Sequence, residues 1–449
     1  MKKAGMPYYT GFTPLFRKGF SSAKIYGASW DKTTTSTLTR TDDAIGLVAN
    51  IGIDNQVVVN DFDNAEIYKD IVEMTDSYGN KFMRIPKFYI KKTDGAGYKT
   101  WQVSKKPFAG AYLPWCFWNF SNGQELPYLD FGKYRASLNG TKLESKTGKA
   151  PLVNTNIVDF RTYAQNNGVG YQQIDMHALD VIRTLFYIEF ATINSQNVAL
   201  GYVYGQYSDS HITNFAETST NRIILTTAYA DAFSVGQTIS IGTSRGGNQI
   251  FYARNIISID TYDASNKAIV FEGTAVDISI GNIVYNTGQI TGSADNITAS
   301  SGSPRANDGK NIFSYRGIES LWGDAWCFID GININDNELW ICDNANEYAS
   351  NVFAVPYKKA SYSKIASNGY AKNMGHDALN QSLEFPIEVG NGSGENYGDY
   401  FYQATGQRVA RLGGGWNNGS RAGLACWSLD DSSTRTYVTI GGRFLKKPL

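Results

Sequence analysis

Residues 408–420 read RVARLGGGWNNGS, and residues 439–445 read TIGGRFL. Both segments place apolar residues beside glycines, which is typical of strands whose backbones approach a neighbour closely. We therefore expect the strands around 411–416 and 440–445 to lie next to each other in one sheet. The residues between them follow neither the strand period nor the helix period. This lack of a period predicts a surface-exposed recognition segment held between two fixed strands. An ordinary long loop with an edge strand explains it equally well.

The composition of the chain narrows the classes of partner. Hydrophobic residues make up 42% and charged residues 18% of the 449 residues, which is typical of globular proteins, and the length allows two or three compact units. Lysine and arginine together number 41, as do aspartate and glutamate, so no net field favours nucleic acid or an anionic membrane. The 29 tyrosines and 45 glycines suit a recognition surface built from loops, although a turn-rich β protein has similar counts.

The sequence carries no pattern for export or membrane insertion. The first ten residues have positive charge without an apolar stretch behind it, and no run approaches the ~20 apolar residues of a membrane span. Cys116, Cys327, Cys342 and Cys426 are too sparse for a disulfide framework, so we expect buried thiols. The expected origin is a reducing cytoplasm, and a protein of this kind that acted outside the cell would leave by a route such as lysis.

Changes of pattern along the chain predict one discontinuous domain interrupted by a guest. The clearest helix runs from Asp175 to Thr192, with Asp175 as its cap and apolar residues on one face. From about Gln206, short strands alternate with Gly, Asp and Asn turns, and a polar stretch from Gly288 to Lys310 closes this region. The expected units are an N-terminal β-rich attachment segment (1–66), a main domain in two parts (67–205 and 301–449) and an inserted small all-β domain (206–300).

Motifs that could carry chemistry lack the context they need. Residues 242–246 match the G-x-S-x-G pattern of a serine nucleophile, but a second β segment follows instead of a helix, so a hairpin turn is expected. The three histidines lie far apart in the sequence. Residues 336–338 and 343–344 offer oxygen ligands for calcium without a full loop register, and solvated turns explain them as well. We expect no catalytic residue, no cofactor and no bound transition metal.

The C-terminal stretch resembles a known protein family. Its frame reads L-G-G-x-W-N-N-G, then A-G, W, S-S and finally I-G-G-R, over residues 412–443. This frame is similar to the variable region of proteins diversified by retroelements, a family that includes the phage major tropism determinant and has a C-type lectin fold related to the formylglycine-generating enzymes. Residues 131–137 and 321–326 are similar to upstream segments of that family. Residues 39–44 and 83–89 are similar to segments in tail and structural proteins of phages that infect gut Firmicutes.

The resemblance implies both a fold and a binding face. The implied class is α+β, a C-type-lectin-like domain with an inserted small all-β domain and a β-rich N-terminal segment. The implied variable region is 415–439. In such regions the retroelement mutates the adenines of asparagine codons, and many of the residue types present here can be encoded by asparagine codons changed in this way. The expected anchors are Trp416, Arg421, Trp427, Arg435 and Tyr437, because aromatic and Arg side chains dominate binding hot spots. The implied ligand-binding residues are Gly415, Asn417, Asn418, Arg421, Ala425, Cys426, Trp427, Ser428, Asp430, Asp431, Arg435, Tyr437 and Thr439.

The chain also departs from the relatives that have catalytic or calcium-dependent activity. Formylglycine-generating enzymes hold copper with a pair of cysteines near the carboxy terminus, whereas Cys426 alone lies in that region of this chain. The E-P-N motif of calcium-dependent sugar binding is missing, and residues 340–344 depart from the related W-N-D motif. We therefore expect a protein that is not an enzyme.

The expected function is adhesion. The resemblance implies a receptor-binding protein at the tip of a phage or prophage tail fibre, where the diversified surface meets a receptor on a bacterial cell, either protein or glycan. Other phage tail proteins are expected partners, nucleic acid and membrane insertion are not, and the resemblance implies a homo-oligomer, with a trimer favoured. Such a protein would be made in the host cytoplasm and carried in the virion. The alternatives are an enzyme of the formylglycine-generating type, a glycan-processing tail protein, and a structural baseplate protein without a receptor.

Overall fold

A computed structural model describes residues 23–33, 35–377 and 380–449 and shows a chain built mostly from β-strands. Strands hold 39% of the residues and helices 11%, with three α-helices among the described residues. The expected α+β class is therefore wrong. Short segments rich in Tyr, Thr, Ile and Val form strands along most of the chain, because such side chains fit a pleated and half-buried surface.

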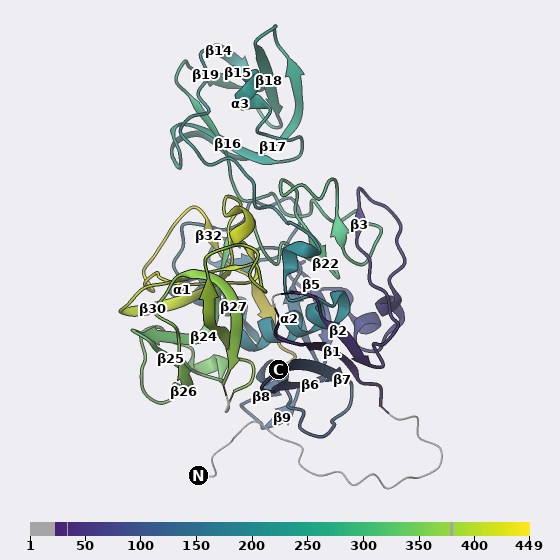
Figure 1. Cartoon of the computed structure of the whole chain (residues 1–449). Helices are drawn as coiled ribbons and strands as arrows, with labels where there is room; N and C mark the ends of the chain where they lie inside the picture. The colour runs from purple at the N-terminus through teal and green to yellow at the C-terminus, as the bar shows by residue number, and fades with distance from the viewer. Residues whose placement is uncertain (1–22, 34, 378–379) are drawn as a thin grey trace.

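Three sheets form the main body (Figure 1), and one apolar core cluster joins them. The four-stranded sheet comprises, in spatial order, β2 (Thr39–Asp42), β1 (Tyr26–Trp30), β7 (Lys99–Ser104) and β6 (Tyr89–Asp94). The five-stranded sheet comprises β13 (Tyr171–Gln173), β33 (Phe444–Lys446), β10 (Tyr128–Gly132), β5 (Lys81–Pro86) and β4 (Val72–Thr75). The largest sheet comprises β26 (Lys358–Ser363), β25 (Glu338–Ile341), β24 (Trp326–Asn335), β30 (Gln407–Gly413), β31 (Gly423–Leu429), β29 (Tyr400–Gln403), β27 (Gly369–His376) and β28 (Glu384–Gly390), with β32 (Ile440–Gly441) paired to β24.

Shorter elements complete the body. A small sheet comprises β23 (Ile318–Glu319), β22 (Ser314–Tyr315), β21 (Gly302–Ser303) and β3 (Gly52–Ile53). Two hairpins pair β11 (Ser137–Asn139) with β12 (Lys142–Glu144) and β8 (Trp118–Asn119) with β9 (Gln124–Glu125). Helix α1 (Ile157–Gln165) begins after Asn156, whose side chain accepts hydrogen bonds from two amides of the first turn.

The two C-terminal segments are strands, as expected, but they are not neighbours. Cys327 of β24 pairs with Leu412 of β30 on one edge and with Gly441 of β32 on the other, so β24 lies between the two segments. The close approach at Gly441 is to a loop, because a Cβ there would lie 2.9 Å from the Leu152 carbonyl oxygen. The chain then leaves this sheet, and β33 pairs with β10 and β13 in the five-stranded sheet.

Helix α2 (Met176–Phe190) packs against the four-stranded sheet and β24, and it confirms the helix expected from the sequence. Asp175 caps it, since its carboxylate accepts a hydrogen bond from the Ala178 amide at 2.9 Å. Every residue from Met176 to Glu189 is buried, rather than one face alone. The polar side chains of the helix therefore need partners inside the protein.

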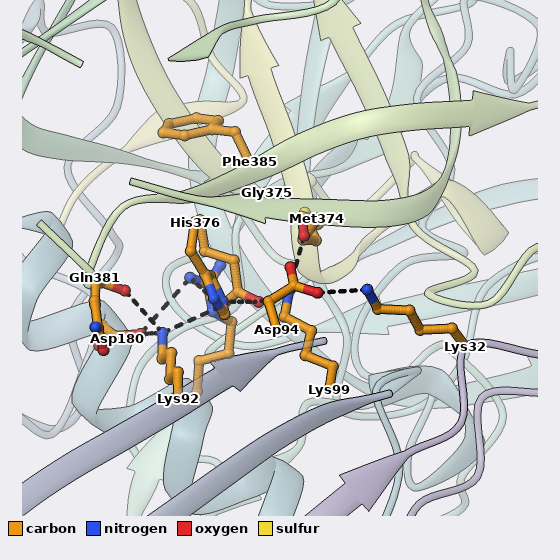
Figure 2. Close-up of polar contacts among 12 residues, drawn as sticks. Lys32, Lys92, Asp94, Lys99, Asp180, Met374, Gly375, His376, Gln381 and Phe385 are labelled. Carbon is orange, nitrogen blue, oxygen red and sulfur yellow. Dashed lines mark hydrogen bonds and ion pairs between the residues drawn. The ribbon is translucent and has the colours of Figure 1, made fainter. Parts of the chain in front are cut away.

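A buried charged cluster joins α2 to strands on both sides of it (Figure 2). Lys92 of β6 pairs with Asp180 of α2, and the Lys99 ammonium of β7 lies 3.0 Å from the Glu384 carboxylate of β28. Arg183 of α2 contacts the same Glu384 carboxylate at 3.1 Å. All five side chains are at most 1% exposed. Charges buried this deeply are tolerated only when they are paired. The pairs made by Glu384 therefore hold β28, β7 and α2 together.

Residues 217–286 form two sheets around an apolar core of their own, drawn at the top of Figure 1. The larger sheet comprises β15 (Arg222–Thr226), β18 (Asn266–Phe271), β17 (Gly247–Thr261), β16 (Thr238–Ser244) and β20 (Ile283–Asn286), and the smaller comprises β14 (Glu217–Thr220) and β19 (Val276–Ile278). Helix α3 (Thr227–Ala230) packs on β15 and β18. Ser244 of β16 pairs with Gly247 of β17, so the motif at 242–246 ends in a hairpin turn at Arg245 and Gly246, as predicted. The division of the chain into domains stays a prediction.

Three further expectations concern the termini, the membrane and the cysteines. Two of the sequence predictions concern residues 1–22, which lie outside the described residues. They are the lack of an export signal and the start of the attachment segment. Within the described ranges, no helix is both long and apolar enough to cross a membrane. All four cysteines are free and buried, as the sequence predicts.

Replacing Glu384 with glutamine should lower the free energy of unfolding by about 3–5 kcal/mol at neutral pH, because buried cations lose their shared partner. Burial alone would raise the pKa of Glu384, but Lys99, Lys92 and Arg183 hold it well below 4.5. The carboxylate therefore contributes stability above pH 4.5, and this contribution is lost progressively as the pH falls below that value. Urea unfolding of both proteins should show a smaller difference at about pH 3.5 than at neutral pH.

Glu388→Gln is the matched control on the same strand. Glu388 is exposed and pairs with the exposed Lys372, so this variant should change the free energy of unfolding by no more than ~0.5 kcal/mol. Equal losses for the two variants at neutral pH would contradict the role given to Glu384.

Glu319 should give the opposite pH dependence. This β23 side chain is buried, and burial raises its pKa to about 8 although the amides of Ala294 and Gly292 donate hydrogen bonds to it. The folded protein then keeps a proton that the unfolded chain releases above pH 4.5, so stability falls as the pH rises toward 8, by about 1.4 kcal/mol per pH unit. Glu319→Gln should remove that slope from urea unfolding between about pH 5 and pH 8. An unchanged slope would mean that this carboxyl is ionised in the folded protein.

Candidate functional site

The implied binding region contains a buried strand. β31 is buried along its whole length, because it lies between β30 and β29 and both faces of the sheet are covered. On one face the Trp427 ring packs against Phe385 with centroids 4.2 Å apart, and on the other Cys426 packs in the cluster that contains Phe160. A strand covered on both faces has no polar alternation, which explains the missing period in the sequence. Four of the implied binding residues lie in this strand and are too buried to contact a ligand at the surface: Ala425, Cys426, Trp427 and Ser428.

Gly415, Trp416 and Thr439 are buried as well. Trp416 is 0% exposed and packs in a small cluster with Tyr202 and Ile312. Trp416 and Trp427 were expected to anchor a ligand, but both rings are buried and have no face open to one. They contribute to the packing of the core instead.

Three exposed residues of the region, Asn417, Ser420 and Arg421, line a concave surface, which we call the Arg421 groove. Its lining comprises residues 203–206 from the segment that precedes the small β unit, Tyr370 of β27, and residues 417–421. The volume of the groove is about 530 Å³. Segments far apart in the sequence therefore meet at one surface beside the largest sheet.

Backbone hydrogen bonds tie the two long walls of the groove together. The Gly419 amide donates to the Val203 carbonyl at 2.9 Å, and the Gly205 amide donates to the Trp416 carbonyl at 2.6 Å. Gly419 has a φ of +58°, and a Cβ at this position would lie 3.1 Å from the Tyr204 ring. Glycine is therefore required where the walls meet, and the groove has a fixed main-chain shape.

Asn417 and Asn418 have different roles despite being adjacent. The Asn418 side chain is half-buried, accepts a hydrogen bond from the Gly415 amide at 2.8 Å and donates to the Tyr402 hydroxyl at 3.3 Å. Asn417 is exposed. Asn418 thus holds the loop in place, whereas the Asn417 amide is open to a ligand.

Arg421 supplies the positive charge of the groove. Its guanidinium lies over the Tyr400 ring, 5.0 Å from the centroid, and its interactions with Tyr402 and Tyr370 raise the pKa of Arg421 above its usual value. The residues that line the groove include no aspartate or glutamate. The site therefore presents a cation, held by tyrosines, that no lining carboxylate neutralises.

The remaining charged residues of the implied binding region are paired within the protein. Asp430 and Asp431 pair with Arg411 of β30 at 2.8 and 2.6 Å, and Arg435 lies 3.6 Å from Asp431. The Arg435 guanidinium also stacks over the Tyr437 ring, 4.9 Å from its centroid. Carboxylates already paired inside the protein have less to gain from a ligand, so this loop is a weaker candidate than the Arg421 groove.

Sequence reasoning missed Tyr204, Gln206 and Tyr370, which line the groove. The available signal was local tyrosine density, since residues 202–207 read YVYGQY and residues 400–403 read YFYQ. Density alone does not show which distant segments meet.

The calcium candidates separate in the fold. Asp336 accepts a hydrogen bond from the Gly406 amide at 2.8 Å, and Glu338 pairs with Lys359. Asp343 instead lies 3.4 Å from His177 and 3.5 Å from Lys358. In the part of the chain that the structure describes, no group of three or more His, Cys, Asp or Glu side chains is arranged to hold a metal ion.

Comparison of the chain with models of known protein families gives no match, and comparison with curated proteins gives none either. The case for a function therefore depends on the geometry and chemistry of the Arg421 groove.

Proposed function

We propose that the protein is a receptor-binding protein of a phage or prophage tail, which adheres to a bacterial surface through the Arg421 groove. The observation that carries this proposal is the contrast between neighbouring residues: Asn417 and Arg421 are exposed in a concave site, whereas Trp416 and the strand β31 are buried. Exposed side chains on a fixed frame suit recognition, because the ligand does not have to order the loop.

The residue types in the groove support adhesion. Tyr and Arg are enriched among the residues that dominate binding energy, and both line this site, as Tyr204, Tyr370 and Arg421. Asn417 and Ser420 add polar groups that adapt to different ligands. The mixture resembles a binding face more than a core or a solvated loop.

An open site of this size suits weak binding per copy, so several copies would raise the avidity. We therefore include in the proposal a homo-oligomer, with a trimer favoured, attached to other tail proteins and carried in the virion. We also include diversification by a retroelement, which the frame around residues 412–443 suggests.

Genomic copies of the gene should differ at codons for exposed residues of the Arg421 groove, such as Asn417 and Arg421, and should keep Trp416. Substitution of a large buried ring leaves a cavity that costs ~3–5 kcal/mol, so selection should remove it. Sequencing of copies from related genomes, with a search for a reverse transcriptase beside the gene, checks this. Differences spread evenly over the whole chain would contradict diversification.

The double variant Asn417→Ala/Arg421→Ala should lose adsorption to bacteria while it keeps its fold. Truncation of a hot-spot residue costs about 2 kcal/mol or more, which is roughly a 30-fold loss of affinity. Both side chains are exposed, so the free energy of unfolding should change by ~0.5 kcal/mol or less. The measurement is binding of the labelled full chain to a panel of gut Firmicutes strains, beside a thermal melt.

Arg435→Ala/Tyr437→Ala is the matched control, because it removes an arginine and an exposed side chain from the same region outside the groove. This control should adsorb within about threefold of the unchanged protein. Loss of adsorption in the control, together with normal adsorption of the groove variant, would place the receptor site elsewhere. Failure of the unchanged protein to bind any strain would count against adhesion itself.

A further inference from the structure

We infer that the ligand of the Arg421 groove is a carbohydrate unit that bears an anionic group. This inference rests on the proposed function for its biological setting, but its chemistry comes from four features of the groove: charge, aromatic faces, amides and shape.

The charge of the groove selects an anion. Arg421 is exposed, its described contacts are with tyrosine rings and hydroxyls, and the lining contains no carboxylate. A guanidinium presents several donors in one plane, which matches the oxygen atoms of a carboxylate or a phosphate. The Tyr400 ring, 5.0 Å from the guanidinium, orients it, so less freedom is lost when a ligand binds.

Aromatic side chains supply surfaces that suit a sugar ring. Tyr204 is 43% exposed, and Tyr370 also lines the groove. The face of a tyrosine ring carries negative potential, which attracts the C–H groups on the apolar face of a pyranose. A tyrosine also has a hydroxyl at its edge. One side chain can therefore contact the apolar face of a sugar and hydrogen-bond to its hydroxyl groups.

Amide side chains match the hydroxyl groups of a sugar. Asn417 is exposed, and Gln206 lines the same groove with its amide nitrogen 3.4 Å from the Tyr204 carbonyl, which leaves one of its two N–H groups and its oxygen for a ligand. Each primary amide both donates and accepts hydrogen bonds, as each sugar hydroxyl does. Asn418 is excluded from this role because its amide is used by Gly415 and Tyr402.

The form of the groove argues against the other ligand classes. A volume of about 530 Å³ accommodates a small ligand rather than a folded partner. Sites for phosphorylated peptides use clusters of arginines, whereas this groove has one. Sites for apolar molecules are lined mainly by hydrophobic side chains, whereas Asn, Gln, Ser, Tyr and Arg predominate in this lining.

The test is calorimetric titration of the full-length chain with four probes. Sialyllactose and a glucuronic-acid disaccharide carry carboxylates, N-acetylglucosamine 6-phosphate carries a phosphate on a sugar, and lactose is the neutral match to sialyllactose. At least one anionic probe should bind about 10-fold or more tighter than lactose, since a hydrogen bond to a charged group changes affinity by this order. The arms separate the two sources of the anion, because a carboxylate site prefers the first two probes and a phosphate site prefers the third.

Variants test whether the preference comes from this groove. Arg421→Gln should remove the preference for the anionic probe, Arg421→Lys should keep part of it, and Tyr204→Ala should weaken the anionic probe and lactose alike. Arg435→Gln, outside the groove, should change neither. The preference of the unchanged protein should also shrink at high salt, because screening weakens exposed charge pairs.

Several results would overturn the inference. Equal binding of lactose and the anionic probes, a preference that survives Arg421→Gln, or no binding of any probe at millimolar concentration would each do so. Failure of the sugar inference can be distinguished from failure of the proposed function by measuring adsorption to cells. Adsorption that depends on Arg421 but is abolished by protease treatment of the cells and resists periodate would mean a protein receptor, so adhesion would stand and the sugar ligand would fall.

Discussion

Backbone pairing along β24 is the constraint on which the C-terminal half depends. At Cys327 both edges of the strand are occupied, by β30 on one side and β32 on the other. The ladder shifts register beyond Ile329, where Gly331 has a φ of +82° that favours glycine and lets the strand bulge. Because β30 then positions β31, the loop between them is pinned at both ends. The walls of the Arg421 groove thus take their positions from main-chain hydrogen bonds and from the Asn418 side chain, rather than from the exposed side chains of Asn417 and Arg421.

The buried charges around α2 join parts of the chain that the sequence separates. Lys92 and Lys99 come from the four-stranded sheet, whereas Glu384 comes from the largest sheet nearly three hundred residues later. An apolar cluster of the same volume could be equally stable, but charge pairs are satisfied in only one arrangement. This cluster therefore specifies how α2, β6, β7 and β28 meet, in addition to any stability that it adds.

The region that carries the proposed binding face also carries core. Positions 417–421 and 434–437 are largely exposed, while β31 between them is buried on both faces. The smaller side chains of that strand, Ala425, Cys426 and Ser428, are fully buried. Variation would be tolerated there only among small residues, whereas exposed positions accept most types. A binding protein built in this way can change its ligand without repacking its sheet.

The sequence by itself determined the features that depend on neighbours along the chain. The cap at Asp175 and the apolar spacing behind it specify α2, and the two-residue turn at Arg245 and Gly246 specifies a hairpin, because both are set by local backbone preferences. The buried thiols and the exposed Asn417 and Arg421 were also predictable. Only the tertiary structure decided that the chain is mostly β, that β24 separates the C-terminal segments, that Trp427 is core, and that Tyr204 and Tyr370 face Arg421. These features depend on which strands pair over hundreds of residues, and local composition does not encode that choice.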